Sequence, residues 1–212
     1  MEETRAIILL NPEEQRVLGT LLEKSRTTPD YYPMTINSLT AACNQKTSRN
    51  PVVNYDEETV TLTLNALKIK GLASTVTASG SRTVKWKHNL AIYYPLLPSD
   101  LAIICLLLLR GPLTPGEINT SAGRLYEFET IEEVQENLQR LASAEPAFIK
   151  QLPKRPGQKE ARFLQLFGGD KPEEIFEPAT ESNSPVANDL EERLAKLETE
   201  VAAMKAILDQ LL

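Results

Sequence analysis

Residues 56–87 read DEETVTLTLNALKIKGLASTVTASGSRTVKWK, and this stretch decides the fold. Its first half predicts a helix that Asp56 caps and that ends before Gly71. The buried stripe of this helix consists of three residues at helical spacing, namely Val60, Leu64 and Leu67. The second half alternates over residues 72–77 and 82–87 around a turn at 78–81, which predicts a β-hairpin.

Two more helices are predicted upstream of this stretch. Asn11 and Glu14 can form a capping box around Pro12, which starts a helix that runs to about Arg26. Thr35 can cap a second, short helix that reaches Cys43, and residues 44–55 form a loop. Three helices followed by a hairpin are the elements of a winged-helix domain in their usual order.

The same order recurs later in the chain. The stripe of the third helix reappears 74 residues further on, as Val134, Leu138 and Leu141. The apolar pair of the first helix reappears only after 86 residues, so the first copy carries about 12 extra residues in its loops at 25–33 and 44–55. We therefore predict a mainly α, α+β fold with two tandem winged-helix domains, at 1–97 and 98–167.

A different composition follows the second hairpin. Residues 168–187 are rich in Gly, Pro, Ser and Glu, which predicts a linker. Residues 188–212 repeat apolar residues at alternating spacings of four and three, which predicts a coiled-coil helix and a homodimer. The seam comprises Leu190, Leu194, Leu197, Val201, Met204, Leu208 and Leu211. The alternative is a lone amphipathic helix that folds back on the body.

Composition narrows the function classes. The net charge of −6 comes from residues 169–212, which alone contribute −7, so the preceding part of the chain is nearly neutral. The longest apolar run, residues 101–109, is too short to span a membrane, and the acidic N-terminus does not resemble a secretory signal. We expect a cytoplasmic protein.

Cys43 and Cys105 lie in apolar stretches and are expected to be reduced core residues. The single histidine, His88, leaves no zinc cluster and no Ser/His/Asp set, so we expect no metal, no cofactor and no enzymatic activity.

Basic residues gather on the two predicted hairpins, where winged-helix proteins contact the phosphate backbone. Trp86 is expected to pack against the third helix, since it faces away from its neighbours Lys85 and Lys87. Both third helices begin with carboxylates, at residues 56–58 and 132–133, which disfavours reading of the major groove. The candidate residues for binding nucleic acid are Lys46, Arg49, Lys68, Lys70, Arg82, Lys85, Lys87, Lys154, Arg155 and Lys159.

The long loops of the first copy form a second candidate surface, because extra loop residues often carry binding functions. Gln45 can join Lys46 and Arg49 in a polar, basic pocket for a partner or an anion. The candidate partner-binding residues are Tyr31, Tyr32, Gln45, Arg124 and Tyr126. The alternative is structural: the tyrosines close the core beneath the second helix, and Tyr126 packs on Phe128.

Two segments carry a resemblance to a known family. Residues 28–33, together with residues 40–46, Arg49 and Pro51, resemble the signature of the uncharacterised bacterial YceH family. Residues 124–128 resemble the second signature of that family. The resemblance implies two winged-helix domains and often a C-terminal coiled coil. It implies no established activity.

Two hypotheses for function follow. The first is a dimeric, regulatory protein that binds duplex DNA through its basic hairpins. The second is a scaffold that holds a protein partner with its tandem winged helices, similar to segregation-and-condensation protein B.

Overall fold

The computed structural model describes residues 6–77, 83–154 and 157–169. Arg82 and Arg155, the predicted linker and the predicted heptad seam lie outside the described residues, apart from the first two positions of the linker, Gly168 and Gly169.

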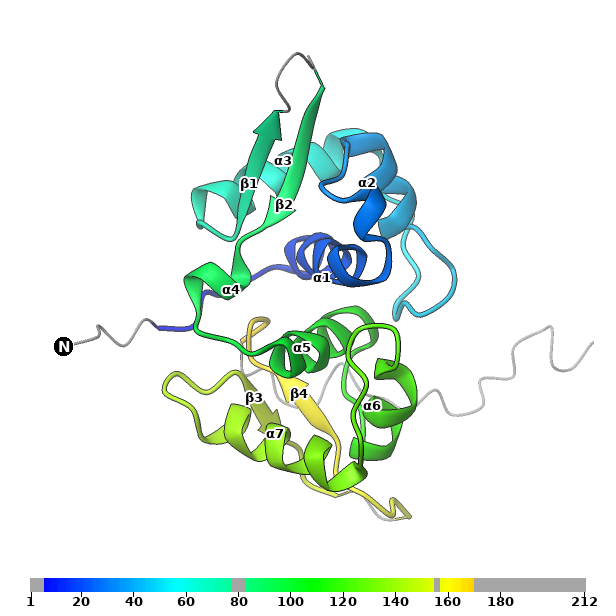
Figure 1. The fold of residues 1–212 in the computed structure, drawn as a ribbon, viewed down its shortest axis with the longest axis vertical. Coiled ribbons are helices and arrows are strands. Elements are labelled where there is room, and N and C mark those ends of the chain that lie inside the picture. The colour runs from blue at the N-terminus through cyan, green and yellow to red at the C-terminus, as the bar shows by residue number, and fades with distance from the viewer. Residues whose placement is uncertain (1–5, 78–82, 155–156, 170–212) are drawn as a thin grey trace, which may run out of the picture. The chain divides into compact units, whose positions relative to one another are not determined.

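The predicted order of three helices and a hairpin occurs twice (Figure 1). The first winged-helix unit contains α1 (Pro12–Thr27), a 3-10 turn η1 (Pro29–Tyr31), α2 (Ile36–Cys43), α3 (Glu57–Ile69), β1 (Ala73–Thr77) and β2 (Val84–His88). The second winged-helix unit contains α5 (Pro98–Arg110), α6 (Pro115–Ala122), α7 (Ile131–Ser143), β3 (Ile149–Gln151) and β4 (Phe163–Gln165). The short helix α4 (Leu90–Tyr93) connects them and was not predicted. The α+β fold class is confirmed.

Each hairpin gains a short third segment from the chain that precedes its second helix. Met34 pairs with Trp86 of β2 through backbone hydrogen bonds of 3.0 and 2.7 Å. Leu113 pairs with Phe163 of β4 at the equivalent place in the second unit. The repeat seen in the sequence therefore extends to the way each hairpin is attached to its helices.

The helices begin where their capping residues predict. The side chain of Asn11 accepts a hydrogen bond from the backbone N–H of Glu14, and the carboxylate of Glu14 accepts one from Asn11, both at 2.8 Å. Thr114 and Glu117 form the same reciprocal box at the start of α6. Asp56 accepts from the N–H of Thr59, which holds the pKa of its carboxyl below the usual range. Carboxylates at these helix starts thus satisfy backbone donors.

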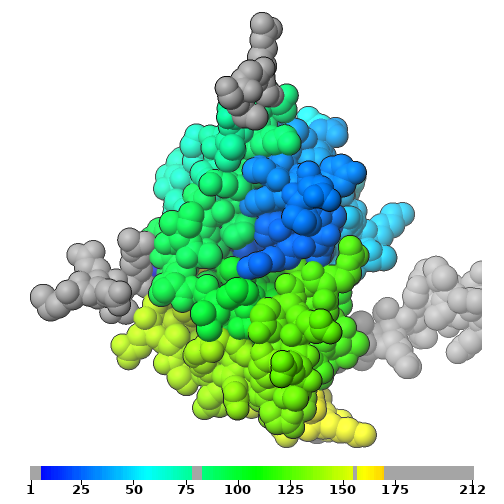
Figure 2. All heavy atoms as spheres, in the orientation of Figure 1, coloured from blue at the N-terminus to red at the C-terminus, as the bar shows by residue number. Residues whose placement is uncertain are grey.

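The first helices of the two units lie side by side at the centre, and the surfaces of the two units meet directly on the face shown in Figure 2. α5 also contacts α6, α7 and β4, so its apolar run at 101–109 is buried all round. At Gly19 α1 packs tightly on α5, since a Cβ there would lie 3.0 Å from the side chain of Leu109. The Cys105 thiol donates to the carbonyl of Gly19 at 3.4 Å. Both cysteines are free and buried, as predicted.

Tyr94 joins the two ends of the described chain. Its hydroxyl donates to the carbonyl of Ala6 at 3.0 Å and accepts from the N–H of Ile8 at 2.9 Å. Its ring packs edge-on against Phe148 and Phe167, with centroids 5.1 and 6.1 Å away. The two units therefore form one compact body. Within the described residues, no helix combines the length and the apolar character needed to span a membrane.

Candidate functional site

The lysines of the first hairpin lie on one face of its sheet, opposite the face that packs against α3. Trp86 is only 5% exposed, and Lys68 of α3 holds its ammonium 5.9 Å from the centre of the Trp86 ring. The predicted packing of Trp86 against α3 is confirmed. Successive strand residues point to opposite faces, so Lys85 and Lys87 lie on the other side from Trp86. Lys85 is exposed and Lys87 is half-buried.

Lys70, a predicted nucleic-acid contact, is instead tied to the N-terminal part of the chain. Its ammonium lies 2.6 Å from the carboxylate of Glu14 and 3.0 Å from the carbonyl of Leu9. The Glu14 side chain is almost fully buried, so this pair anchors the end of α3 to the start of α1. Lys70 thus has a structural role, and its contact with nucleic acid stays a prediction.

Arg49 also has a structural role. Its side chain is 0% exposed, and its guanidinium donates to both carboxylate oxygens of Glu23, at 3.0 and 2.6 Å. It also donates to the carbonyl of Ala42 at 3.1 Å and to Gln45 Oε1 at 3.2 Å. Sequence reasoning treated Arg49 as a surface cation. The structure instead makes it the centre around which the 44–51 loop folds.

The carboxylate of Glu23 forms an ion pair with this buried guanidinium. Burial raises the pKa of Glu23. The hydrogen bonds and charge of Arg49, with a smaller contribution from Lys24, lower the pKa by more than burial raises it, so the net shift is downward. Asn44 fixes the other end of the loop, because its side chain donates to the carbonyl of Tyr55 at 2.7 Å and accepts from the N–H of Tyr55 at 2.8 Å. The loop is therefore held at both ends.

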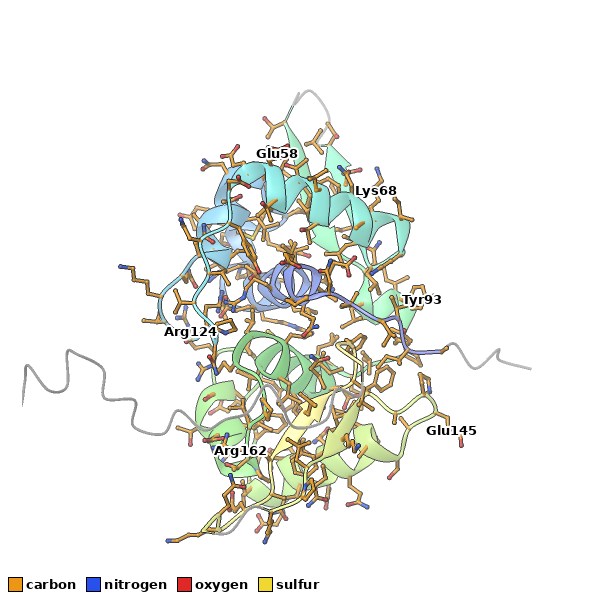
Figure 3. All side chains as sticks on the ribbon, turned by 180° about the vertical axis from the view of Figure 1, so that it is seen from behind. Glu58, Lys68, Tyr93, Arg124, Glu145 and Arg162 are labelled. Carbon is orange, nitrogen blue, oxygen red and sulfur yellow. The ribbon has the colours of Figure 1, made fainter. Side chains whose placement is uncertain are left out.

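A pocket of about 500 Å³ opens beside this loop, where the two winged-helix units meet. We call it the junction pocket. It brings together three predicted residues, Gln45 and Lys46 from the first unit and Arg124 from the second. Figure 3 shows Arg124 at the side of the body where the 44–51 loop reaches the second unit. Its other lining residues are Glu23, Lys24, Thr27, Thr28, Thr47, Ser48, Leu106, Leu109, Arg110, Ser121 and Leu125.

Sequence reasoning missed two cations of the junction pocket. Arg110 ends α5, where a basic residue reads as a partner of the helix dipole, and Lys24 occupies the same place in α1. Arg110 spans the two units, since it donates to Ser48 Oγ at 2.9 Å and to Ser121 Oγ at 3.0 Å. Only the packing of α1 on α5 brings these residues together, so no local signal in the sequence could have found them.

The three predicted tyrosines have separate surroundings. The hydroxyl of Tyr32 accepts from the N–H of His88 at 2.7 Å, and burial raises the pKa of Tyr32 to about 12. Tyr126 packs on Phe128 with ring centroids 4.8 Å apart and donates to Glu133 at 3.2 Å. Both contacts agree with the structural alternative. Tyr31 is 78% exposed and faces solvent.

The second unit presents a different surface. The exposed side chains of α7 include Glu132, Glu136 and Gln135, and Arg140, its one cation, pairs with Asp100. In the second hairpin Lys154 and Lys159 are exposed, and the ammonium of Lys154 donates to the carbonyl of Lys159 at 3.2 Å. The two hairpins extend toward opposite ends of the body (Figures 1 and 3).

Comparison with known proteins identifies the family. Residues 10–158 match the model of a family described as "Protein of unknown function, DUF480". The chain belongs to this family. The chain is 45% identical over 209 residues to a UPF0502 protein of Shewanella piezotolerans, covering 95% of this chain and 96% of the relative. It is 42% identical over 198 residues to a UPF0502 protein of Opitutus terrae, covering 93% of this chain and 84% of the relative. The predicted membership of an uncharacterised bacterial family is confirmed.

The DUF480 match spans both winged-helix units up to the second hairpin, so it includes α3 and the junction pocket. In this DUF480 chain α3 exposes two large apolar side chains, Leu62 at 64% and Ile69 at 87%. Glu58 and Lys68 lie near its two ends (Figure 3). The exposed face of α3 is thus of mixed character, with apolar, acidic and basic groups.

Proposed function

We propose that this chain is a non-enzymatic binding protein whose first winged-helix unit contacts the phosphate backbone of duplex DNA. The observation that carries the proposal is a set of three lysines in the first unit: Lys68 lies on α3, the helix that winged-helix proteins bring to DNA, and Lys85 and Lys87 lie on the hairpin that follows it, on the face away from Trp86. Each lysine that neutralises a phosphate releases counterions, which gives affinity without sequence readout.

The proposal assigns the contact to the first unit alone. Both third helices begin with exposed carboxylates, but on α7 they continue to Glu136 and its one cation, Arg140, is paired with Asp100. In the first unit, residues 68–88 contain lysines and no carboxylate. The second hairpin lies at the other end of the body and is left free for a separate contact. This differs from the sequence-based hypothesis, in which both hairpins bind.

The test is fluorescence anisotropy with a mixed-sequence duplex of about 20 base pairs, in a series of salt concentrations. A double variant in which both Lys85 and Lys87 are replaced by Gln should reduce the magnitude of the slope of log affinity against log salt by about 2. The reason is that each phosphate contact releases about 0.9 counterions. The matched control replaces Lys154 and Lys159 with Gln and should leave the slope unchanged. Equal effects of the two double variants, or no binding by the original chain at low salt, would contradict the proposal.

The exposed apolar side chains of α3 support a second candidate function, a scaffold for a protein partner. Leu62 and Ile69 are exposed on the helix that a DNA-binding protein would fill with polar groups. The test is cross-linking in cells. If the chain is a scaffold, the original chain captures a stoichiometric protein partner, and the variant with both Leu62 and Ile69 changed to Ser does not. The same variant keeps the salt-dependent DNA binding of the original chain if the first proposal holds alone.

The predicted homodimer is part of both readings. Light scattering should give a dimer for the full chain and a monomer for a chain that ends at Gly169. If both chains are monomers, the prediction that the heptad seam forms a homodimer is wrong.

A further inference from the structure

We infer that the junction pocket is a binding site for a small phosphate monoester. Nothing in this inference depends on DNA binding, because the pocket lies on residues other than the lysines of the first hairpin. Its cations come from both units: Lys24 and Lys46 from the first, and Arg110 and Arg124 from the second.

The electrostatics of the pocket favour a multiply charged anion. Four cationic side chains line it, against a single carboxylate, Glu23. That carboxylate is already engaged, since Arg49 binds both of its oxygens and the ammonium of Lys24 lies 3.0 Å from one of them. The pocket lining therefore carries excess positive charge, which an inorganic or esterified phosphate would neutralise.

The walls of the pocket are fixed before any ligand arrives. The buried Arg49 holds the 44–51 loop in place, and the backbone N–H of Asn50 donates to the carbonyl of Leu109 at 2.8 Å, which joins the loop to α5. Arg110 is held by hydroxyl groups of Ser48 and Ser121 on opposite walls. A ligand thus meets Arg110 with its conformational freedom already reduced, which raises affinity for a given set of contacts.

The remaining lining defines the size and class of ligand. A volume of about 500 Å³ lies within the range of sites for small molecules. Leu106, Leu109 and Leu125 add apolar side chains to the lining. The pocket accordingly fits a phosphate group on a compact organic body, with the phosphate toward Arg110 and Arg124.

The experiment is calorimetric titration of the full chain with inorganic phosphate as the probe, at constant ionic strength, with chloride as the reference anion. We expect saturable binding of phosphate that chloride does not reproduce. Arg124→Gln and Lys46→Gln each remove one cation from an exposed position and should weaken phosphate binding about tenfold, because hydrogen bonds between charged groups are the stronger kind. Lys159→Gln, an exposed lysine of the second hairpin, is the matched control and should bind phosphate like the original chain.

Three results would overturn the inference. These are heats that match those of chloride, equal weakening by Lys159→Gln, and unchanged binding in both pocket variants.

The assignment to a small ligand has a separate test. If a short duplex displaces bound phosphate, the pocket lies on the path of DNA and the assignment to a small ligand is wrong. Loss of DNA binding in the Lys85 and Lys87 double variant, with phosphate binding intact, would leave the inference standing on its own.

Discussion

Replacing Arg49 with Met should destabilise the protein severely. The variant leaves the largely buried carboxylate of Glu23 without the guanidinium that binds both of its oxygens, so that its cationic partner is the ammonium of Lys24, 3.0 Å from one of them. Removing one partner of a buried ion pair costs about 3–5 kcal/mol. The loop also loses its hydrogen bonds to the carbonyl of Ala42 and to Gln45. In a folded body of this size, each kcal/mol lowers Tm by about 2–4 °C, so the expected drop is about 10 °C.

Thermal unfolding followed by circular dichroism measures this effect, and a double variant identifies its cause. Adding Glu23→Leu to Arg49→Met removes the stranded carboxylate and should restore more than about 1 kcal/mol of the loss. Lys46→Met, an exposed neighbour in the same loop, should change the free energy of unfolding by less than about 0.5 kcal/mol. A drop in Tm below about 2 °C for Arg49→Met, or no rescue by the second substitution, would refute the account of Arg49 as the centre of the loop.

Three further changes test the packing and the titration of the body. Gly19→Val should cost about 2 kcal/mol or more in chemical denaturation, because even a Cβ would lie 3.0 Å from Leu109, whereas Gly123→Val, with open space around it, should cost less than about 1 kcal/mol. Burial, with the charges of Arg26 and Lys87, lowers the pKa of His88 to about 4. The unfolded chain, with a His pKa near 6.5, therefore binds more protons between these values, so His88 contributes stability above pH 6.5 that is lost as the pH falls toward 4. This contribution amounts to about 3 kcal/mol, and the stability of His88→Gln should fall less over that range in urea titrations at several pH values. Tyr94→Phe removes two hydrogen bonds that hold Ala6 and Ile8, so it should cost about 1–2 kcal/mol and speed amide hydrogen exchange at Ile8; unchanged exchange would contradict the role of the hydroxyl.

Most of the fold could be predicted from the sequence because its signals are local. Asn11, Thr35 and Asp56 accept hydrogen bonds at the helix starts that their types predict, and Trp86 packs where strand alternation places it. The sequence predicts the strands of the second hairpin over 147–152 and 161–167, and the structure has shorter ones, at 149–151 and 163–165. Backbone hydrogen bonds from Leu152 to Arg162 and from Leu166 to Phe148, both 2.8 Å, continue the pairing just beyond these strands.

The candidate site was less predictable because its geometry depends on contacts between distant residues. A loop arginine such as Arg49 looks the same in sequence whether it faces solvent or a carboxylate 26 positions earlier. Gln45 and Lys46 were predicted to share a pocket, and Arg124 was a separate candidate in the second unit. The packing of α1 on α5 brings all three around one pocket. The apolar run of α5 indicated burial, but it did not indicate that the same helix serves two units.

The complete burial of α5 has a consequence for how the molecule folds. A chain cut after residue 97 would leave the α5-facing side of α1 as bare apolar surface, and residues 98–169 alone would leave the opposite surface bare. Each copy of the repeat has therefore lost the independence that a winged-helix domain usually has. Residues 6–169 should melt in a single cooperative transition, as one folding unit assembled from two copies of one motif.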